Sequence, residues 1–445
     1  MQLNENDPLK IVYSWIGPRG PIVNTELPNI MSYASVGEST DAHGSNFFWA
    51  DDIYWRVFMH NGNHPLSSTF GLGDNDPFIY PFTLAWRIQF QNYFLNGGGI
   101  LEFSHTPGHI THQVRDRNGF FLIDCAPEAW VQDGQLRAMH AYFEHYNRIP
   151  MGKIIYITGC MNVVELYHNW CDRNGIPSDP MHRMIVIPFP ISQHALSIQV
   201  PNAPEPVYDE TRLPEKVFLC WNRRFRPHRT NLALALDKHG LVDRSYYSMN
   251  LNDPELNSMH FKNTVDLYSN PMLRISNQDV TNFMAKLPLV IDGETQIQQM
   301  CGDFNRAAKD FYENSLVSII TETNFELSEL TATEKTWKPA KEKHPFIMVG
   351  TCGALRTLRD EFGFQTFDEF WDESYDDEED PRMRLFKIVE VCRDIGQWTP
   401  EQILDFKRRV KPIVEHNYKM LKQNTSKTVA DKIRVEVGKR LRDLP

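Results

Sequence analysis

A cluster of cationic side chains stands out in the segment 220–229, which reads CWNRRFRPHR. The segment follows a run of β-branched and aromatic residues that predicts a strand, and it leads into a predicted helix. At such a turn, helical N–H groups and arginine guanidinium groups can both hold the oxygens of a diphosphate. We therefore expect an anion-binding site here, with a solvated run of surface charge as the alternative. The candidate ligands are Arg223, Arg224, Arg226, His228 and Arg229.

A second group of candidates lies in the segment 318–339, SIITETNFELSELTATEKTWKP. A predicted strand ends at Glu322, and Thr333, Glu334 and Lys335 open the next predicted helix. A carboxylate can accept both hydroxyls of a ribose while an ammonium group meets a phosphate. A glutamate near a helix start also compensates the helix dipole, so spacing alone leaves the two interpretations of this pair equal.

The elements that must position these residues alternate between strand and helix. Strands separated by helical patterns of 10–15 residues indicate βαβ units and parallel sheets. In the first half, the pattern predicts strands at 10–15, 100–103, 119–124, 153–158 and 184–187, and helices at 81–95, 134–147 and 163–174. In the second half, it predicts strands at 216–220, 246–249, 316–322 and 345–349, and helices at 228–239, 304–312, 333–341 and 354–361.

This alternation predicts the α/β class, with two Rossmann-like lobes, a cleft between them and a C-terminal helical tail. A segment with four prolines and no amphipathic period, VPNAPEPVYDETRLP, indicates a linker between the lobes. The predicted domains are an N-terminal lobe at 1–200, the linker at 201–214, a C-terminal lobe at 215–395 and a basic helical tail at 396–445. The tail begins with a helix-start signal at Thr399-Pro400-Glu401.

The charge is unevenly distributed along the chain. A net charge of −11 argues against a protein devoted to coating nucleic acid. The run 368–380, DEFWDESYDDEED, has nine acidic residues and no basic one, and we expect its part 372–380 to be a mobile loop. The segment 406–445 has twelve Lys and Arg against four acidic residues, a net charge of +8. It suits contact with phosphates such as those of DNA, or a helical hairpin that packs on the acidic run or stays solvated.

The composition also bears on location and metal binding. No long apolar run predicts a membrane span, and the first residues, MQLNENDP, do not resemble a signal peptide. The seven scattered cysteines contain no CxxC pair, which favours reduced thiols in the cytoplasm. Pro and Gly interrupt the histidines of HTPGHITH, so we predict no metal site.

One block of the second half reads DFYENSLVSIITETNF and is followed by TATEKTWKPAKEKHPFIMVGTCGALRTLRDEFGFQTFDE. This block resembles the donor-binding half of GT-B glycosyltransferases and is most similar to the family-ten fucosyltransferases. In that family, the Glu and Lys of a Thr-Glu-Lys motif hold the ribose and phosphates of the nucleotide, which implies these roles for Glu334 and Lys335. An arginine after the lobe's first strand contacts the diphosphate, which points to the segment 223–229. The resemblance spans about residues 216–370 and departs from the family at Ala332, where those enzymes have an aromatic-Val pair. The chain also resembles uncharacterised glycosyltransferase-like proteins of large bacterial viruses.

The resemblance implies an enzyme that moves a sugar from a UDP- or GDP-linked donor to an acceptor hydroxyl, without another cofactor. The acceptor would be a glycan, a protein or a modified DNA base held by the N-terminal lobe. Inverting, metal-independent transfer is favoured because arginine and lysine can neutralise the leaving diphosphate. Asp124 and Glu128, at a predicted strand end, are the candidate catalytic bases, and His105, Asp51 and Asp52 are rivals. The alternative is a non-catalytic virion, structural or carbohydrate-binding protein with the same fold.

Overall fold

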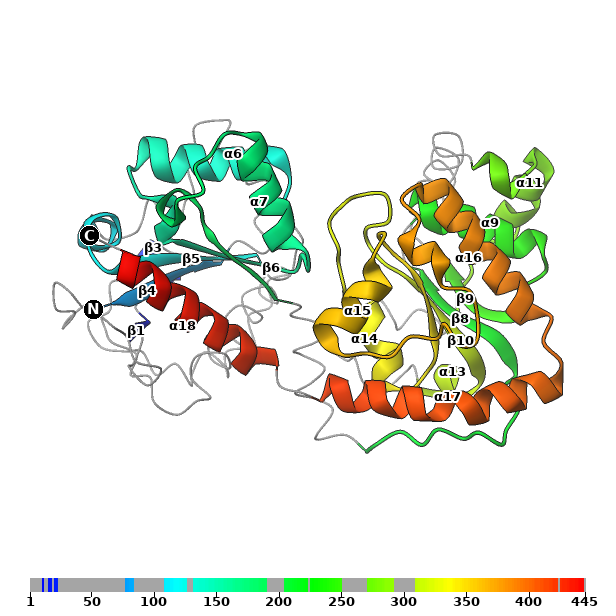
Figure 1. Ribbon diagram of the computed structural model, residues 1–445. Coiled ribbons are helices and arrows are strands. Elements are labelled where there is room, and N and C mark those ends of the chain that lie inside the picture. Colours follow the sequence, from blue (N-terminus) through cyan, green and yellow to red (C-terminus); the bar gives the residue numbers. More distant parts are fainter. Residues whose placement is uncertain are drawn as a thin grey trace. The chain divides into compact units, whose positions relative to one another are not determined.

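The computed structural model places the chain in two compact units (Figure 1). The first comprises Met1–His194 with Asn424–Pro445, and the second comprises Ala195–Gln423. The residues that the structure describes are 10–11, 15–17, 20–22, 77–83, 108–125, 131–189, 204–222, 225–249, 270–291, 309–422 and 425–443. Each unit has a parallel sheet with helices and the C-terminal segment is helical, which confirms the predicted α/β class. The domain boundaries at 200, 214 and 395 stay predictions.

The described residues of the first unit form a sheet of five parallel strands in the order β1-β4-β5-β6-β7. They are β1 (Lys10–Ile11), β4 (Phe78–Thr83), β5 (Gly119–Cys125), β6 (Ile154–Thr158) and β7 (Ile185–Pro188). An antiparallel pair, β2 (Trp15–Gly17) and β3 (Gly20–Ile22), also belongs to this unit. All five residues of β6 are buried, as expected for a β-branched strand covered on both faces.

The predicted helix at 81–95 is wrong at its start. Residues Pro81–Thr83 belong to strand β4, because they pair with β5. The run FIYPFT combines aromatic and β-branched residues that suit a strand, whereas Pro81 suggested the first position of a helix. The proline fits here because β1 pairs only with Phe78 and Ile79 and leaves the rest of that edge of β4 without a described partner. The predicted strand 100–103 lies outside the described residues.

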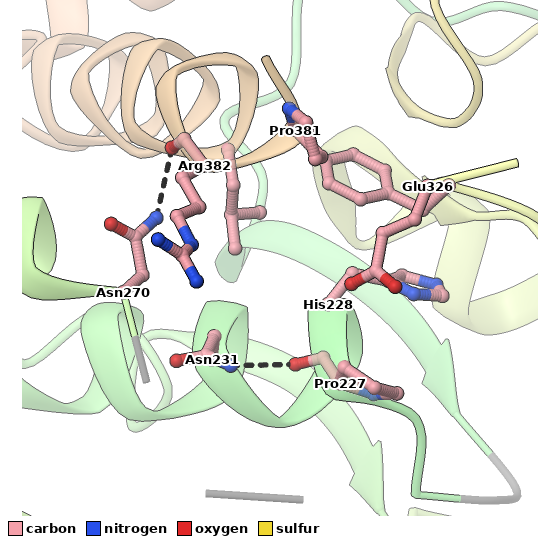
Figure 2. Close-up of a pocket in the computed structure, with 9 residues that line it drawn as sticks. Pro227, His228, Asn231, Asn270, Glu326, Pro381 and Arg382 are labelled. Atoms are coloured by element: carbon pink, nitrogen blue, oxygen red, sulfur yellow. Dashed lines mark hydrogen bonds between the residues drawn. The ribbon is translucent and has the colours of Figure 1, made fainter. Parts of the chain in front are cut away.

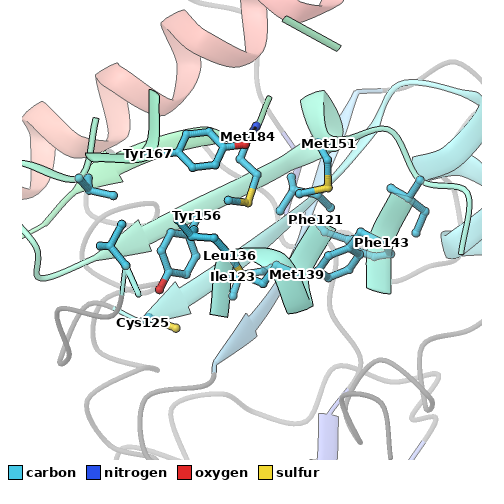
Figure 3. Packing of buried hydrophobic residues seen from close by; sticks show 14 of the residues in the cluster. Phe121, Ile123, Cys125, Leu136, Met139, Phe143, Met151, Tyr156, Tyr167 and Met184 are labelled. Atoms are coloured by element: carbon cyan, nitrogen blue, oxygen red, sulfur yellow. Dashed lines mark hydrogen bonds between the residues drawn. The ribbon is translucent and has the colours of Figure 1, made fainter. Parts of the chain in front are cut away.

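The first unit buries its core between the sheet and the helices α6 (Asp133–His140) and α7 (Val163–Arg173) (Figure 3). The π-helix η3 (Ala141–Tyr146) continues α6, and α5 (Gly108–Asp116) precedes β5. Figure 1 shows α6 and α7 on one side of this sheet and α18 (Thr425–Asp443) on the other. Helix α18 contacts β7 and buries Ile433, Val437 and Leu441. The predicted elements at 119–124, 134–147, 153–158, 163–174 and 184–187 are confirmed within a few residues at each end.

The described residues of the second unit form a sheet of four parallel strands in the order β11-β10-β8-β9. They are β8 (Lys216–Asn222), β9 (Ser245–Met249), β10 (Ser315–Thr321) and β11 (Phe346–Val349). The chain first moves outward from β8 to β9 and then returns to place β10 on the other side of β8. The strand order therefore reverses between β8 and β10, and ligands of open α/β sheets bind at the carboxyl ends of such a strand pair.

Helices cover this second sheet. The steps from β8 to β9 and from β10 to β11 run in opposite directions across the sheet. Because such crossovers are right-handed as a rule, we expect α9 (Pro227–Lys238) and α14 (Glu334–Lys341) on opposite faces. Helix α9 contacts α16 (Pro381–Gly396) and α11 (Asn277–Met284), and nine consecutive residues, 228–236, are buried along it. Helix α14 contacts β10 and α17 (Pro400–Leu421), which begins with the predicted Thr399 cap. The other α-helices that the structure describes in this unit are α13 (Lys309–Glu313) and α15 (Ala354–Phe362). None of the described helices is long and apolar enough to cross a membrane.

The acidic run is folded, so the expectation of a mobile loop is wrong. Its centre forms a short 3-10 helix, Ser374–Asp377, and Asp376 is 3% exposed. The Asp376 carboxylate accepts hydrogen bonds of 2.9 Å from the backbone N–H groups of Leu355 and Arg356. It thereby caps α15, whose N-cap residue is a glycine without a side chain. The long-range cap explains why a run of like charges is ordered.

Glu373 should make stability depend on pH. Burial raises its pKa to about 7 from an ordinary value of 4.5, although Phe367 N–H donates to it at 2.9 Å. The folded state therefore holds the proton more tightly than the unfolded chain, and stability is lost as the pH rises from about 4.5 through about 7. Replacing Glu373 with glutamine should remove this pH-dependent loss of unfolding free energy, which is on the order of 2 kcal/mol above pH 7. Urea titrations at pH 5 and at pH 8 measure it. An equal pH dependence in both proteins would contradict the assignment.

The basic tail is divided between the units. Helix α17 belongs to the second unit, where Arg409 pairs with Glu369 of the acidic run and Lys411 Nζ lies 2.5 Å from Glu210. Helix α18 belongs to the first unit, where Arg440 donates to the carbonyl of Arg183 at 3.1 Å. Several tail cations are therefore engaged within the protein. The predicted linker residues 204–214 form no helix or strand.

Candidate functional site

The candidate site lies at the carboxyl ends of β8 and β10, the strand pair where the order of the sheet reverses. The last residues of the two strands contact each other, because Thr321 Oγ1 donates to Asn222 Oδ1 at 2.6 Å. Both side chains are buried. The two segments that carry the predicted donor-binding residues thus start side by side, although 99 residues separate them in the chain.

His228 and Arg229, at the start of α9, point to the end of β10. His228 Nε2 donates to the Glu322 carbonyl at 3.0 Å, and Arg229 Nη2 donates to the Thr321 and Glu322 carbonyls at 3.0 and 3.2 Å. Both side chains are about 95% buried. Burial lowers the pKa of His228 to about 3 and that of Arg229 to about 10, so the imidazole is neutral and the guanidinium is charged at pH 7. In this structure they hold the main chain of the neighbouring loop.

Glu322 is the centre of a buried hydrogen-bond network. Its side chain is 1% exposed, and its carboxylate accepts from the Thr333 backbone N–H at 2.9 Å and from Thr336 Oγ1 at 2.6 Å. The Thr333 hydroxyl and the Thr323 backbone N–H lie within hydrogen-bonding distance as well. Because α14 starts at Glu334 with Thr333 as its N-cap, Glu322 fixes the start of that helix.

Glu334 and Lys335 lie at the exposed end of this network. Their side chains are 29% and 24% exposed, and Lys335 Nζ is 3.2 Å from Glu334 Oε1. Lys335 Nζ also lies 2.9 Å from Thr333 Oγ1. Burial alone would raise the pKa of Glu334, but Lys335 and Lys338 hold it below its ordinary value. A negative carboxylate beside an ammonium group at a helix start suits a ligand with hydroxyl and phosphate groups.

Arg384 of α16 fixes the loop between β10 and α14. It is 3% exposed, it donates to the Phe325 carbonyl, and its guanidinium lies 4.5 Å from the Phe325 ring centre. The same group donates to the Glu378 carbonyl at 2.5 Å. His228 stacks on Phe325 with ring centres 5.1 Å apart and planes 20° apart. The loop is thus held by α9 and α16 together.

A pocket of about 250 Å³ opens beside this loop (Figure 2). Its walls come from the starts of α9 and α16, from the loop after β10 and from Asn270. Asn270 Nδ2 donates to the Arg382 carbonyl and Asn231 Nδ2 to the Pro227 carbonyl. Of the predicted site residues that the structure describes, His228 alone lines the pocket. The lining residues are Pro227, His228, Asn231, Asn270, Phe325, Glu326, Pro381, Arg382 and Leu385.

The other predicted residues are placed only in part. Arg226 is the N-cap residue of α9. Asp124 is the penultimate residue of β5, in register with Thr83 and Ile157, and nothing is described of its side chain. Outside the described residues lie Arg223, Arg224 and Glu128, together with the rivals His105, Asp51 and Asp52. Within the described part of the chain, no group of His, Cys, Asp and Glu could hold a metal ion.

Sequence reasoning found His228, Arg229 and Glu322 but missed other residues that fix this site. The threonines of TATEKT flank the start of a predicted helix, and this spacing is the signal that could have indicated the partners of Glu322. Arg384 and Arg382 carry no such signal, because the contact between Arg384 and Phe325 spans 59 residues. The pocket residues Asn270 and Glu326 become neighbours only when α9 and α16 pack together.

Comparisons with known proteins give weak likenesses. No protein-family model matches the sequence, and no curated protein sequence matches it. The α,α-trehalose 6-phosphate synthase of Burkholderia multivorans is 11% identical, with a TM-score of 0.40 over 93% of this chain and 79% of that one. The UDP-forming enzyme of Burkholderia xenovorans is 9% identical, with a TM-score of 0.40 over 89% and 79%. The N-terminal domain of Candida albicans trehalose-6-phosphate phosphatase is 10% identical, with a TM-score of 0.37 over 88% and 75%.

These structures are neither fucosyltransferases nor viral proteins, so both resemblances seen in the sequence stay predictions. At this level of similarity we draw no function from them. This chain itself has the parallel sheets and the contacts at the ends of β8 and β10.

Proposed function

We propose that this chain is a glycosyltransferase whose second unit binds a nucleotide diphosphate sugar. One observation carries the proposal: the segments after β8 and β10 meet where the strand order reverses, and they fix the start of α14. This is the place where open α/β sheets bind nucleotides. Glu334 and Lys335 emerge there with opposite charges and partial exposure.

The residues of the network divide into two groups. Glu334 would accept the ribose hydroxyls and Lys335 would meet a phosphate, with Arg226, Arg223 and Arg224 as further cations for the diphosphate. His228, Arg229 and Glu322 support these groups from below by hydrogen bonds to the backbone or to the start of α14. With cations rather than a metal stabilising the leaving diphosphate, metal-independent transfer follows.

The chemical step would use the first unit. A carboxylate, Asp124 or Glu128, would take the proton of the acceptor hydroxyl while its oxygen forms a bond to the anomeric carbon. The bond from that carbon to the diphosphate oxygen breaks, and the diphosphate leaves with the electron pair. Such a single displacement inverts the configuration at the anomeric carbon.

The acceptor is a glycan or protein hydroxyl in this proposal. A DNA acceptor would need free cations in the tail, whereas Arg409, Lys411 and Lys422 pair with carboxylates and Arg440 binds a carbonyl. Transfer should therefore depend little on salt, because few counterions are released on binding. An activity with DNA that falls steeply as salt rises would contradict this choice.

Nucleotide binding tests the proposal directly. UDP, GDP, ADP, CMP and their common sugar conjugates are added to the wild type and to Lys335→Ala in a thermal-shift panel. A ligand at 100 times its Kd adds about 2.7 kcal/mol, which raises Tm by several degrees. We expect one nucleotide to stabilise the wild type and to lose most of its effect in the variant. Lys387→Ala, which removes a partly exposed lysine of α16, is the matched control and should respond as the wild type does.

Failure of every nucleotide to stabilise a folded wild type would overturn the proposal. It would favour the alternative of a non-catalytic structural or carbohydrate-binding protein. An equal response of wild type and Lys335→Ala would place the nucleotide elsewhere on the chain.

A further inference from the structure

The pocket between the starts of α9 and α16 carries two charged side chains of opposite sign. Glu326 comes from the loop after β10, and Arg382 lies in the first turn of α16. No described residue forms an ion pair or a hydrogen bond with the carboxylate of Glu326 or with the guanidinium of Arg382. Figure 2 shows both groups reaching from different sides into the hollow above α9.

A third polar atom belongs to His228. Its Nε2 carries the proton, because it donates to the Glu322 carbonyl at 3.0 Å. Since burial keeps this imidazole neutral, Nδ1 has a free electron pair and is an acceptor. No described residue donates to Nδ1, and His228 lines the pocket. The pocket thus has the acceptors Glu326 and His228 and one cationic donor, Arg382, together with the side-chain amides of Asn231 and Asn270.

The other lining residues, Pro227, Phe325, Pro381 and Leu385, are apolar. The volume of about 250 Å³ equals that of about eight water molecules in the liquid, which suits a ligand with a similar number of heavy atoms. An ammonium group donates up to three hydrogen bonds and so matches the two acceptors. A carboxylate matches the guanidinium of Arg382 in bidentate geometry.

We infer that this pocket binds a small zwitterion of amino-acid size, with its ammonium group at Glu326 and His228 and its carboxylate at Arg382. The pocket adjoins the site proposed for the nucleotide sugar, because Pro227 and His228 directly follow Arg226 in the chain. A diphosphate beside Glu326 would be repelled. A nucleobase would find no free aromatic face on Phe325, because His228 stacks on that ring and the Arg384 guanidinium lies 4.5 Å from its centre.

Calorimetry and thermal shift on the full chain test the inference with glycine, L-alanine and L-serine as probes. Acetate and methylamine are the half-ligand controls, since each satisfies only one side of the pocket. We expect saturable binding of at least one amino acid, with affinity at least about tenfold above that of either control. Glu326→Gln and Arg382→Gln should each weaken the binding by about tenfold or more.

Arg393→Gln is the matched control, because Arg393 lies near the far end of α16 and pairs with Glu390 instead. It should bind the probe as the wild type does. The exposed positions of Glu326 and Arg382 allow both variants to fold, which their unliganded melting curves verify.

Absence of saturable binding, equal binding of acetate, or unchanged affinity in both pocket variants would each overturn the inference. Guanosine binding that Glu326→Gln abolishes would overturn it in favour of a nucleobase site. These outcomes do not depend on Lys335, so they are separable from a failure of the proposed function.

Discussion

Replacing Glu322 with alanine is expected to lower the free energy of unfolding by about 4 kcal/mol, because it strips partners from several buried donors at once. The backbone N–H groups of Thr323 and Thr333 and the hydroxyl of Thr336 all lose their acceptor. Glu322→Gln keeps one oxygen but turns an amide NH₂ toward donors, so we expect a smaller loss of about 2 kcal/mol. Urea denaturation of the three proteins measures both losses.

The same variants should lose nucleotide binding without removing any proposed ligand contact. Glu322 fixes Thr333, the N-cap residue of α14, and a shifted helix start displaces Glu334 and Lys335. Glu379→Gln is the matched control, because Glu379 is exposed and also near a helix start. It should change stability by less than about 0.5 kcal/mol. An unfolding free energy of Glu322→Ala that equals the control value would contradict the network.

Placing a charge at Val437 should destabilise the first unit by about 3–5 kcal/mol, the cost of burying an unpaired charge and losing apolar contact. Val437 is fully buried on α18, which contacts β7. Val435 on the same helix is 53% exposed, so Val435→Asp has the same intrinsic helix propensity cost without the burial. We expect Val437→Asp to lower the thermal transition of the first unit strongly and Val435→Asp to lower it only slightly.

Limited proteolysis distinguishes the two units in this experiment. With Val437→Asp, cleavage should appear first in residues of the unit formed by Met1–His194 and Asn424–Pro445. Cleavage of both variants at equal rates would show that α18 does not stabilise that unit. First cleavage within Ala195–Gln423 would place the contribution of α18 in the other unit.

Local patterns predicted most of the described strands, but not β4 or the helices α5 and α11. Alternating runs of β-branched residues and amphipathic segments placed β5, β6, β8, β10 and β11, because such strands are buried on both faces and need apolar side chains throughout. The Thr399 signal placed the start of α17, since a capping box is formed by residues three apart. The helix expected at 81–95 failed at its start because a proline suits both a first helical turn and an incompletely paired stretch of strand.

The candidate residues were predicted from the sequence, but their roles were decided by tertiary contacts. His228, Arg229 and Glu322 were predicted as ligands because of their types and their places at strand ends. The structure directs His228 and Arg229 at backbone carbonyls and Glu322 at the start of α14, since each is buried against segments about 90 or 11 residues away. A side chain's charge is visible in the sequence, whereas the direction it points depends on packing.

The sequence by itself determined the α/β class, the extent of most elements and the clustering of cations and carboxylates after the strands. Only the tertiary structure decided the reversal of strand order between β8 and β10, the packing of α18 on the first unit and the pocket between α9 and α16. The physical reason is range: helix and strand signals arise from neighbours within a few residues, whereas strand order and helix docking depend on contacts between segments far apart in the chain.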